Sequence, residues 1–109
     1  MKTVCIVVEP GVCGFRCTVT ASGHNRRHVD LAITGSACGQ IKRLAELVTE
    51  LSMVDIFKPP MKNPVYAAAT TAGCHSTCPV PLAVLKAAEA GLGLALKRDV
   101  QMLFSDECT

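Results

Sequence analysis

The sequence predicts an α+β domain in which an antiparallel sheet carries helices on one face. Two stretches in the N-terminal third alternate between apolar and polar side chains, and three later stretches carry helical spacing or helix-end signals. Strand signals therefore precede helix signals along most of the chain, which is typical of the α+β class. We expect the order β-β-β-α-α-α-β in one domain over residues 1–109, a length that supports a single hydrophobic core.

Three strands are expected first. Residues 3–8, Thr-Val-Cys-Ile-Val-Val, are rich in β-branched side chains and stop at the breaker Glu9-Pro10-Gly11. Residues 15–21 and 28–34 each place apolar side chains at every second position, and a polar turn joins the two stretches. This pattern predicts an antiparallel hairpin with one buried face.

A helix is expected to begin near Cys38, because the hydrophobic period changes there from two to 3.6. Its apolar stripe consists of Ile41, Leu44, Val48 and Leu51. Lysine, arginine and glutamate occupy the positions between them, as on a helix with one face in water.

Two further helices have clear end signals. Asn63 is placed as the N-cap of a helix with proline in its first turn, and Gly73 is placed as its stop. Pro81 suits the first turn of the next helix, which we expect to end at Gly91 or Gly93.

The last predicted element is a strand, because Val100, Met102 and Phe104 alternate with other residues before a polar tail that carries Cys108. A small sheet of this kind has exposed edge strands. We therefore expect that two copies can pair as a homodimer through such an edge.

Composition argues against several functions. The net charge is only +2, basic residues are scattered, and there are four aromatic residues, so no nucleic-acid surface is indicated. The apolar run 87–96 is interrupted by Glu89 and two glycines and is too short for a membrane span. The apolar stretch 4–8 is too short for a signal peptide, so we expect a cytoplasmic protein. Seven cysteines in that reducing compartment indicate metal binding or thiol chemistry rather than disulfides.

Four cysteines are the candidate metal ligands. Cys38 opens the first helix and Cys78 lies just ahead of the third, and free N–H groups at a helix N-terminus stabilise a thiolate. Cys74 forms a C-x3-C pair with Cys78. Cys13 lies in a glycine-flanked turn, where it is either a ligand or an ordinary exposed thiol. Four thiols suit a zinc ion or an iron–sulfur cluster.

The remaining candidates have simpler interpretations. His75 can add a nitrogen ligand, but a solvent-facing loop residue is the simpler interpretation. Cys17 alternates with apolar residues on the buried face of its strand, and Cys5 lies inside an apolar strand, so both are interpreted as small hydrophobic residues. Cys108 is placed in the tail.

Two alternatives to metal binding stay open. One is a thiol-redox or persulfide-handling protein, in which Cys74 and Cys78 cycle to a disulfide and Cys38 is the nucleophile. The other is a structural or interaction domain with incidental buried thiols. No serine–histidine–carboxylate set or carboxylate pair is recognisable, so the sequence does not point to an enzyme.

Several motifs resemble an uncharacterised family of small cysteine-containing proteins from anaerobic prokaryotes. The motifs are Gly11-Val12-Cys13-Gly14-Phe15, Ser36-Ala37-Cys38, Cys74-His75-Ser76-Thr77-Cys78-Pro79-Val80-Pro81 and Gly91-Leu92-Gly93-Leu94-Ala95-Leu96. This resemblance implies a shared fold and carries no activity with it.

A fainter resemblance is to iron–sulfur scaffold proteins of the NifU and IscU type. Three strands, a cysteine that opens a helix (Cys38) and a later cysteine before a C-terminal helix (Cys78) follow the scaffold order. The scaffold motif has an acidic residue where this chain has Gln40, and the scaffold ends in a long helix rather than a strand. The resemblance therefore implies cluster or zinc binding but not cluster transfer.

Overall fold

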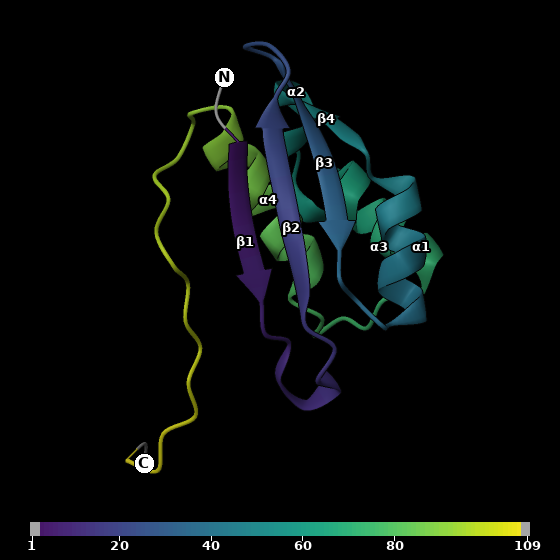
Figure 1. Ribbon diagram of the computed structural model, residues 1–109, viewed down its shortest axis with the longest axis vertical. Helices are drawn as coiled ribbons and strands as arrows, with labels where there is room; N and C mark the ends of the chain where they lie inside the picture. The colour runs from purple at the N-terminus through teal and green to yellow at the C-terminus, as the bar shows by residue number, and fades with distance from the viewer. Residues whose placement is uncertain (1–2, 108–109) are drawn as a thin grey trace.

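The computed structural model describes residues 3–107 and contains a four-stranded antiparallel sheet in the order β1-β2-β3-β4 (Figure 1). Its strands are β1 Thr3–Val8, β2 Cys17–Gly23, β3 His28–Thr34 and the short β4 Glu50–Ser52. The predicted hairpin is confirmed, with Val19 opposite Ile33 and Ala21 opposite Leu31. The α+β class is therefore correct, and β1 and β4 are the two edges of the sheet.

The helices pack against one face of this sheet. They are α1 Gly39–Leu47, α2 Met53–Ile56, α3 Pro64–Ala72 and α4 Val80–Gly91, with 3₁₀ turns η1 Gly11–Cys13 and η2 Pro60–Lys62. In Figure 1, α4 lies behind β1 and β2, while α1 and α3 lie beyond the β3 side of the sheet. The opposite face carries no helix among the described residues.

The core lies between the sheet and α4. The inward side chains of β2 and β3, including Val19, Ala21 and Val29, are completely buried. On α4, small residues let the helix approach closely: a Cβ at Gly91 would lie 3.2 Å from Val29 Cγ2 and 3.3 Å from Ala21 Cβ. An alanine-rich helix thus supplies an aliphatic core without large aromatic side chains.

The predicted ends of α3 are confirmed. The Asn63 side chain accepts a hydrogen bond from the Val65 backbone N–H at 2.9 Å, as an N-cap does. Gly73 ends the helix with φ of 79°, a left-handed conformation that other residues adopt at a cost. The next helix begins around Pro81 and ends at Gly91, also as predicted.

The first helix is shorter than predicted. It ends at Leu47, and Leu51 belongs to β4, where it is 3% exposed and pairs with Val29. A residue three positions after Val48 fits a helical stripe, but the short strand buries Leu51 equally well. Spacing alone therefore could not separate the two structures.

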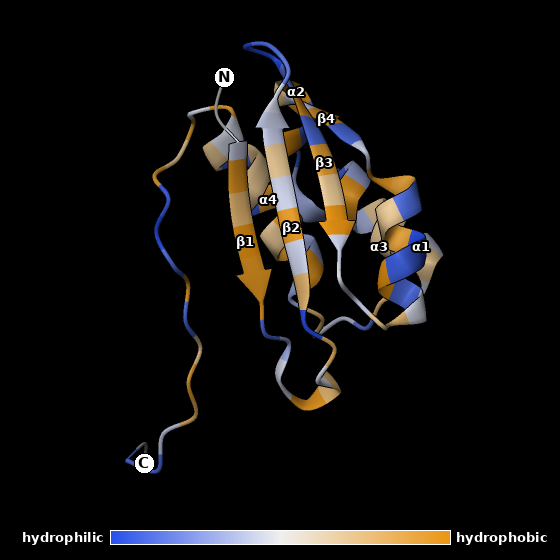
Figure 2. Ribbon diagram, in the orientation of Figure 1, coloured by the Kyte–Doolittle hydropathy of each residue, from blue (hydrophilic) through white to orange (hydrophobic). Residues whose placement is uncertain are grey.

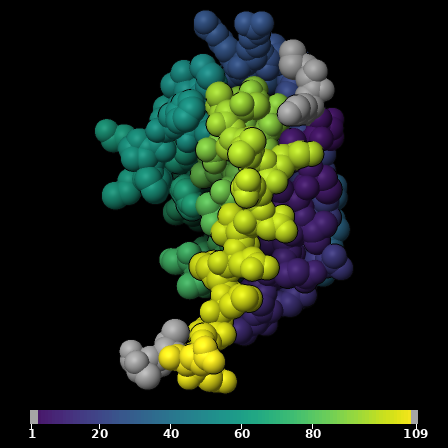
Figure 3. All heavy atoms as spheres, turned by 90° about the vertical axis from the view of Figure 1, so that its left-hand side faces the viewer, coloured from purple at the N-terminus to yellow at the C-terminus, as the bar shows by residue number. Residues whose placement is uncertain are grey.

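The predicted strand at residues 100–104 is wrong, so the order is β-β-β-α-β-α-α-α. The chain after α4 is extended but pairs with no described strand, and Val100, Met102 and Phe104 are 55%, 83% and 110% exposed. Figures 1 and 3 show this segment running along the outside of the molecule on the β1 side. Alternation makes a strand only where a neighbouring strand is available. Cys108 lies outside the described residues.

Figure 2 shows that the strands differ in hydropathy. The edge strand β1 is apolar along most of its length, whereas β3 alternates between apolar and polar positions. Val4 and Val8 point into the core at 4% and 6% exposure, while Val7 on the other face is 49% exposed. The expected pairing of two copies through an edge strand stays a prediction.

Candidate metal centre

The register of the sheet brings three cysteine-bearing segments to one end. Cys17 opens β2 opposite Val8, the last residue of β1, so the turn that carries Cys13 lies beyond this end. The next residue of β2, Thr18, pairs with Thr34, the last residue of β3. The segment that leads to Cys38 therefore leaves the sheet at the same end, the lower end in Figure 1.

The connection between α3 and α4 reaches this end as well (Figure 1). After Gly73, the Cys74 backbone N–H donates to the Ala69 carbonyl at 2.9 Å, and the Cys78 N–H donates to the His75 carbonyl at 3.0 Å. These bonds form a tight turn that holds both cysteines next to the start of α4. We refer to Cys13, Cys17, Cys38, Cys74 and Cys78 together as the cysteine end.

The five thiols differ in burial. Cys17 is 2% exposed and belongs to the hydrophobic core, and Cys38, Cys74 and Cys78 are half-buried and pack against that core. Cys13 is exposed. All five are free thiols, as is Cys5, which lies apart on the outer face of β1. The five thiols of the cysteine end thus range from the exposed Cys13 to the fully buried Cys17.

Burial and mutual repulsion disfavour thiolates here. Burial raises the pKa of Cys17, and negative charge on Cys78, Cys38 and Cys13 raises it further. Burial also raises the pKa of Cys74, with added repulsion from Cys78 and Cys38 and partial relief from the Arg43 guanidinium.

Cys78 experiences opposing effects. Burial is the largest and raises its pKa, a hydrogen bond from the Val80 backbone N–H lowers it, and Cys13 and Cys38 raise it. The expected stabilisation of a thiolate at a helix start is therefore present, but it is outweighed. Without a cation, Cys78 stays a neutral thiol at neutral pH.

Polar partners for the thiols are few. Cys38 is the N-cap residue of α1, and its Sγ donates to Gln40 Oε1 at 3.2 Å. The Arg43 guanidinium bonds the Ala72 carbonyl at 3.1 Å, which places a positive charge near Cys74. The Cys38 backbone N–H donates to Ser36 Oγ at 3.1 Å and so fixes the approach to the helix.

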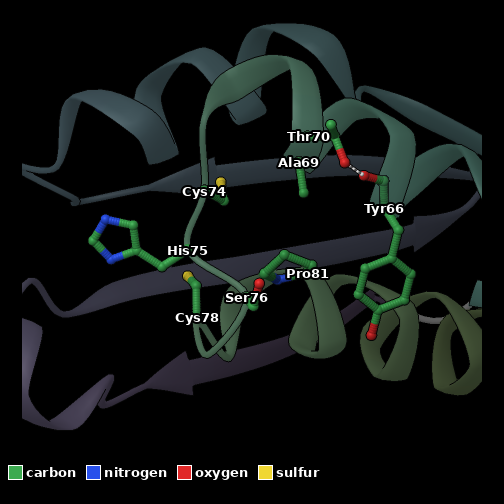
Figure 4. Close-up of a pocket in the computed structure, with 8 residues that line it drawn as sticks. All are labelled: Tyr66, Ala69, Thr70, Cys74, His75, Ser76, Cys78 and Pro81. Carbon is green, nitrogen blue, oxygen red and sulfur yellow. Dashed lines mark hydrogen bonds between the residues drawn. The ribbon is translucent and has the colours of Figure 1, made fainter.

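A pocket of about 250 Å³ adjoins the C-x3-C pair (Figure 4). Its walls are formed by Tyr66, Ala69, Thr70, Cys74, His75, Ser76, Cys78 and Pro81. His75 is exposed, and Figure 4 shows its ring extending outward from the loop, away from Tyr66. The interpretation of His75 as a solvent-facing loop residue therefore agrees with the structure.

The thiols gather without forming a finished coordination sphere. Within residues 3–107, no three histidine, cysteine, aspartate or glutamate side chains are arranged to hold a metal ion. The four cysteines selected from the sequence are nevertheless all at one end of the molecule. Thiolates are ligands of soft cations such as zinc, but the described residues as placed form no coordination site.

The prediction that Cys17 is a buried core residue is confirmed, but the sequence did not show that Cys17 lies at the same end of the sheet as the other four cysteines. The alternation of its strand correctly indicated a buried side chain, which was sufficient for a core interpretation. The overlooked signal is its position at the first residue of β2, directly after the turn that carries Cys13. A side chain at the first residue of a strand can contact the core and also the loops beyond that end of the sheet.

These features define an α+β domain with a cluster of thiols at one end of an antiparallel sheet. The chain belongs to a family of unknown function, DUF6951, whose model matches residues 4–104. The match includes all five residues of the cysteine end. No curated protein and no solved structure gives a significant match to the chain.

None of the helices in the described part of the chain combines the length and apolar character needed to cross a bilayer. The longest of them, α4, has 12 residues.

Proposed function

We propose that the protein binds a thiophilic metal, as a zinc ion or an iron–sulfur cluster, through Cys13, Cys38, Cys74 and Cys78. One observation carries the proposal: cysteines from separate parts of the chain share one end of the sheet, where burial and repulsion from neighbouring thiolates raise the pKa of Cys74 and Cys78. A bound cation offsets that repulsion. Thiolates are the common ligands of structural zinc and of iron–sulfur clusters.

Burial strengthens this argument. Cys38, Cys74 and Cys78 are packed against the core rather than fully solvated, so unpaired thiolates there have little water to stabilise them. A metal ion of charge +2 supplies the missing partner and lowers the proton affinity of every thiol that it contacts.

In this proposal, the turn that carries Cys13 moves to complete the site. Gly11 and Gly14 bracket this turn with φ of 79° and 72°, conformations in which glycine is free of strain. Neither position would bring a Cβ within 4 Å of another group. The turn therefore has space to shift, and we propose that such a shift brings the exposed Cys13 thiol to its half-buried neighbours.

The resemblance to iron–sulfur scaffolds supports the same chemistry. Cys38 opens a helix after a three-stranded unit, and Cys78 precedes the last helix, as in the scaffold order. Gln40 replaces the scaffold's acidic residue, and its amide oxygen accepts from the Cys38 thiol. A neutral amide in this position favours retention of a bound metal over its release.

Thiol-redox chemistry at Cys74 and Cys78 is the second candidate, because both cysteines line the same pocket. Burial raises the pKa of both thiols, which opposes the formation of an attacking thiolate. Metal binding needs thiolates as well, so this pKa shift does not separate the two chemistries. Metal binding ranks first because Cys13 and Cys38 lie at the same end of the sheet and a Cys74–Cys78 disulfide leaves them without a role.

The test is anaerobic purification of the untagged chain, followed by metal analysis and an absorption spectrum. We expect either about one zinc per chain or iron with a broad thiolate band on the order of 400 nm. Cys38→Ser and Cys78→Ser should lose the metal, whereas Cys5→Ser, a cysteine outside the cluster, should retain it. Metal-free protein with reactive Cys74 and Cys78 would favour redox chemistry, and inert thiols would favour a purely structural domain.

A further inference from the structure

The segment that follows α4 is extended, apolar and unpaired. Gly93, with φ of 73°, turns the chain out of α4, and residues 97–104 then run along the outside of the molecule on the β1 side (Figures 1 and 3). Val100, Met102 and Phe104 alternate with other residues and are each at least 55% exposed. Among the described residues, no strand pairs with this segment. Apolar side chains held in water along an extended backbone indicate a surface that a partner covers.

The edge strand β1 is the complementary surface. No strand of the described residues lies beside its outer edge, so a row of backbone N–H and C=O groups is free for pairing. On the core face of β1, Ile6 is only half-buried, whereas Val4 and Val8 on either side of it are buried. The core is therefore partly open at the middle of this edge. The other edge strand, β4, has only three residues and offers a much shorter pairing surface.

We propose that residues 97–104 pair with the free edge of β1 in a second copy of the chain, and that two copies exchange these segments reciprocally in a homodimer. Each chain offers one unpaired strand and one unpaired edge, so a mutual exchange satisfies both. Eight residues in β conformation span about 26 Å, which is enough to cover the six residues of β1. The inference does not depend on metal binding, because it involves none of the cysteines of the cysteine end.

Strand direction favours a second copy over the chain's own β1. In Figure 1 the segment leaves α4 at the end of the sheet where β1 begins and runs in the same direction as β1, so pairing within one chain would be parallel. Every strand pair of the described sheet is antiparallel, and parallel pairing is slightly less stable per residue. A second copy related by a twofold axis presents its β1 in the opposite direction. A Cβ at Gly93 would meet nothing within 4 Å, so the connection has room to turn toward that copy.

The test is the molar mass of the full-length chain, measured by analytical ultracentrifugation over a concentration series with a thiol reductant present. We expect a dimer of twice the mass of one chain. Val100→Asp should weaken dimerisation by more than about tenfold, because it places a carboxylate in an apolar contact. Val54→Asp is the matched control, since Val54 lies on α2 and is 66% exposed against 55% for Val100. This variant should dimerise like the unmodified chain.

Hydrogen exchange locates the contact in the same samples. Backbone amides of residues 98–104 and of the free edge of β1 should be protected together in the dimer, and dilution should remove both protections. Both replaced valines are exposed in one chain, so each variant should stay folded, which circular dichroism checks. Four results would overturn the inference: a monomer at every concentration, an open assembly larger than a dimer, protection of the segment that dilution leaves unchanged, or a dimer that Val100→Asp does not weaken.

Discussion

The two ends of the sheet are stabilised in different ways. At the end near α2, polar groups find partners within the chain: Ser52 Oγ accepts from the Asp55 N–H at 3.1 Å, and Asp55 Oδ2 accepts from the Ser52 N–H at 3.4 Å. Asn63 is 2% exposed, and its Nδ2 donates to the Asp55 carbonyl at 3.0 Å and the Lys58 carbonyl at 3.3 Å. Within residues 3–107, every buried side-chain nitrogen and oxygen has a partner.

The thiols of the cysteine end have fewer partners within the chain. Its half-buried and buried thiols repel one another when charged, and Arg43 and the Val80 N–H relieve only part of the cost. Polar groups at the α2 end are satisfied within the chain, whereas at the cysteine end only the proposed metal would supply a partner for charged thiolates. This contrast is the main physical reason to place the function at the cysteine end.

Zinc binding should have the largest effect on stability. A ligand that binds only the folded state at 1,000 times its Kd stabilises the protein by about 4 kcal/mol. We expect a rise of that order in the free energy of unfolding by urea under anaerobic reducing conditions. Cys78→Ser should show no rise with zinc, and an equal response of this variant and the unmodified chain would place the zinc elsewhere.

Asn63→Ala should be the most damaging change at the α2 end. It removes the cap of α3 and leaves two carbonyl groups without their donor, which together cost about 2–4 kcal/mol. Urea unfolding measures the loss. Metal content per folded chain should be unchanged, because Asn63 caps the end of α3 that lies away from Cys74, and a parallel loss of metal would show that the two ends are coupled.

Ser52→Ala should cost about 1 kcal/mol, since it removes one half of the capping box of α2. The comparison variant is Thr70→Ala, whose hydroxyl bonds only the Tyr66 carbonyl of its own helix. It should change stability by less than about 0.5 kcal/mol. Equal losses in the two variants would show that the capping box stabilises the fold no more than the intrahelical bond of Thr70 does.

Acid should weaken the α2 end through Asp55. The hydrogen bond from Lys58, with further bonds from Ser52, lowers the Asp55 pKa below its ordinary value of 3.8, although burial opposes this. The stabilisation is present above pH 3.8 and is lost as the pH falls through the lower, folded-state pKa. Asp55→Asn should therefore be less stable than the unmodified chain near neutrality, and the difference should shrink below pH 3.8 in urea unfolding.

The smallest expected effect is that of Cys5→Ser. Cys5 is exposed on the outer face of β1, so its replacement should change stability by less than about 0.5 kcal/mol. A large loss of stability on urea unfolding would show that this face of the sheet is covered in solution.

Local signals predicted the parts of the fold that depend on local chemistry. The hairpin followed from alternation, and both ends of α3 followed from Asn63 and Gly73, whose roles are set within a few residues. The strand expected at 100–104 failed because strand pairing depends on a distant neighbour. Leu51 was assigned to a helix for the same reason, since β4 exists only through its pairing with β3.

The candidate site was predictable only in outline. Helix starts and the C-x3-C spacing selected Cys38, Cys74 and Cys78, and the structure places these three with Cys13 at one end of the sheet. Cys17 was assigned to the core because period-two alternation reports which face a residue occupies, not what lies beyond the end of the strand. That information comes from the register of β1, β2 and β3.

The most direct test of the central claim is thiol alkylation of the full-length apo chain, with and without zinc, under anaerobic conditions, read by peptide mass spectrometry. If the cysteine end binds the metal, zinc should protect Cys13, Cys38, Cys74 and Cys78 together over one concentration range. Cys5 should be modified equally in both samples. Unchanged modification of these four thiols in the presence of zinc would contradict the account.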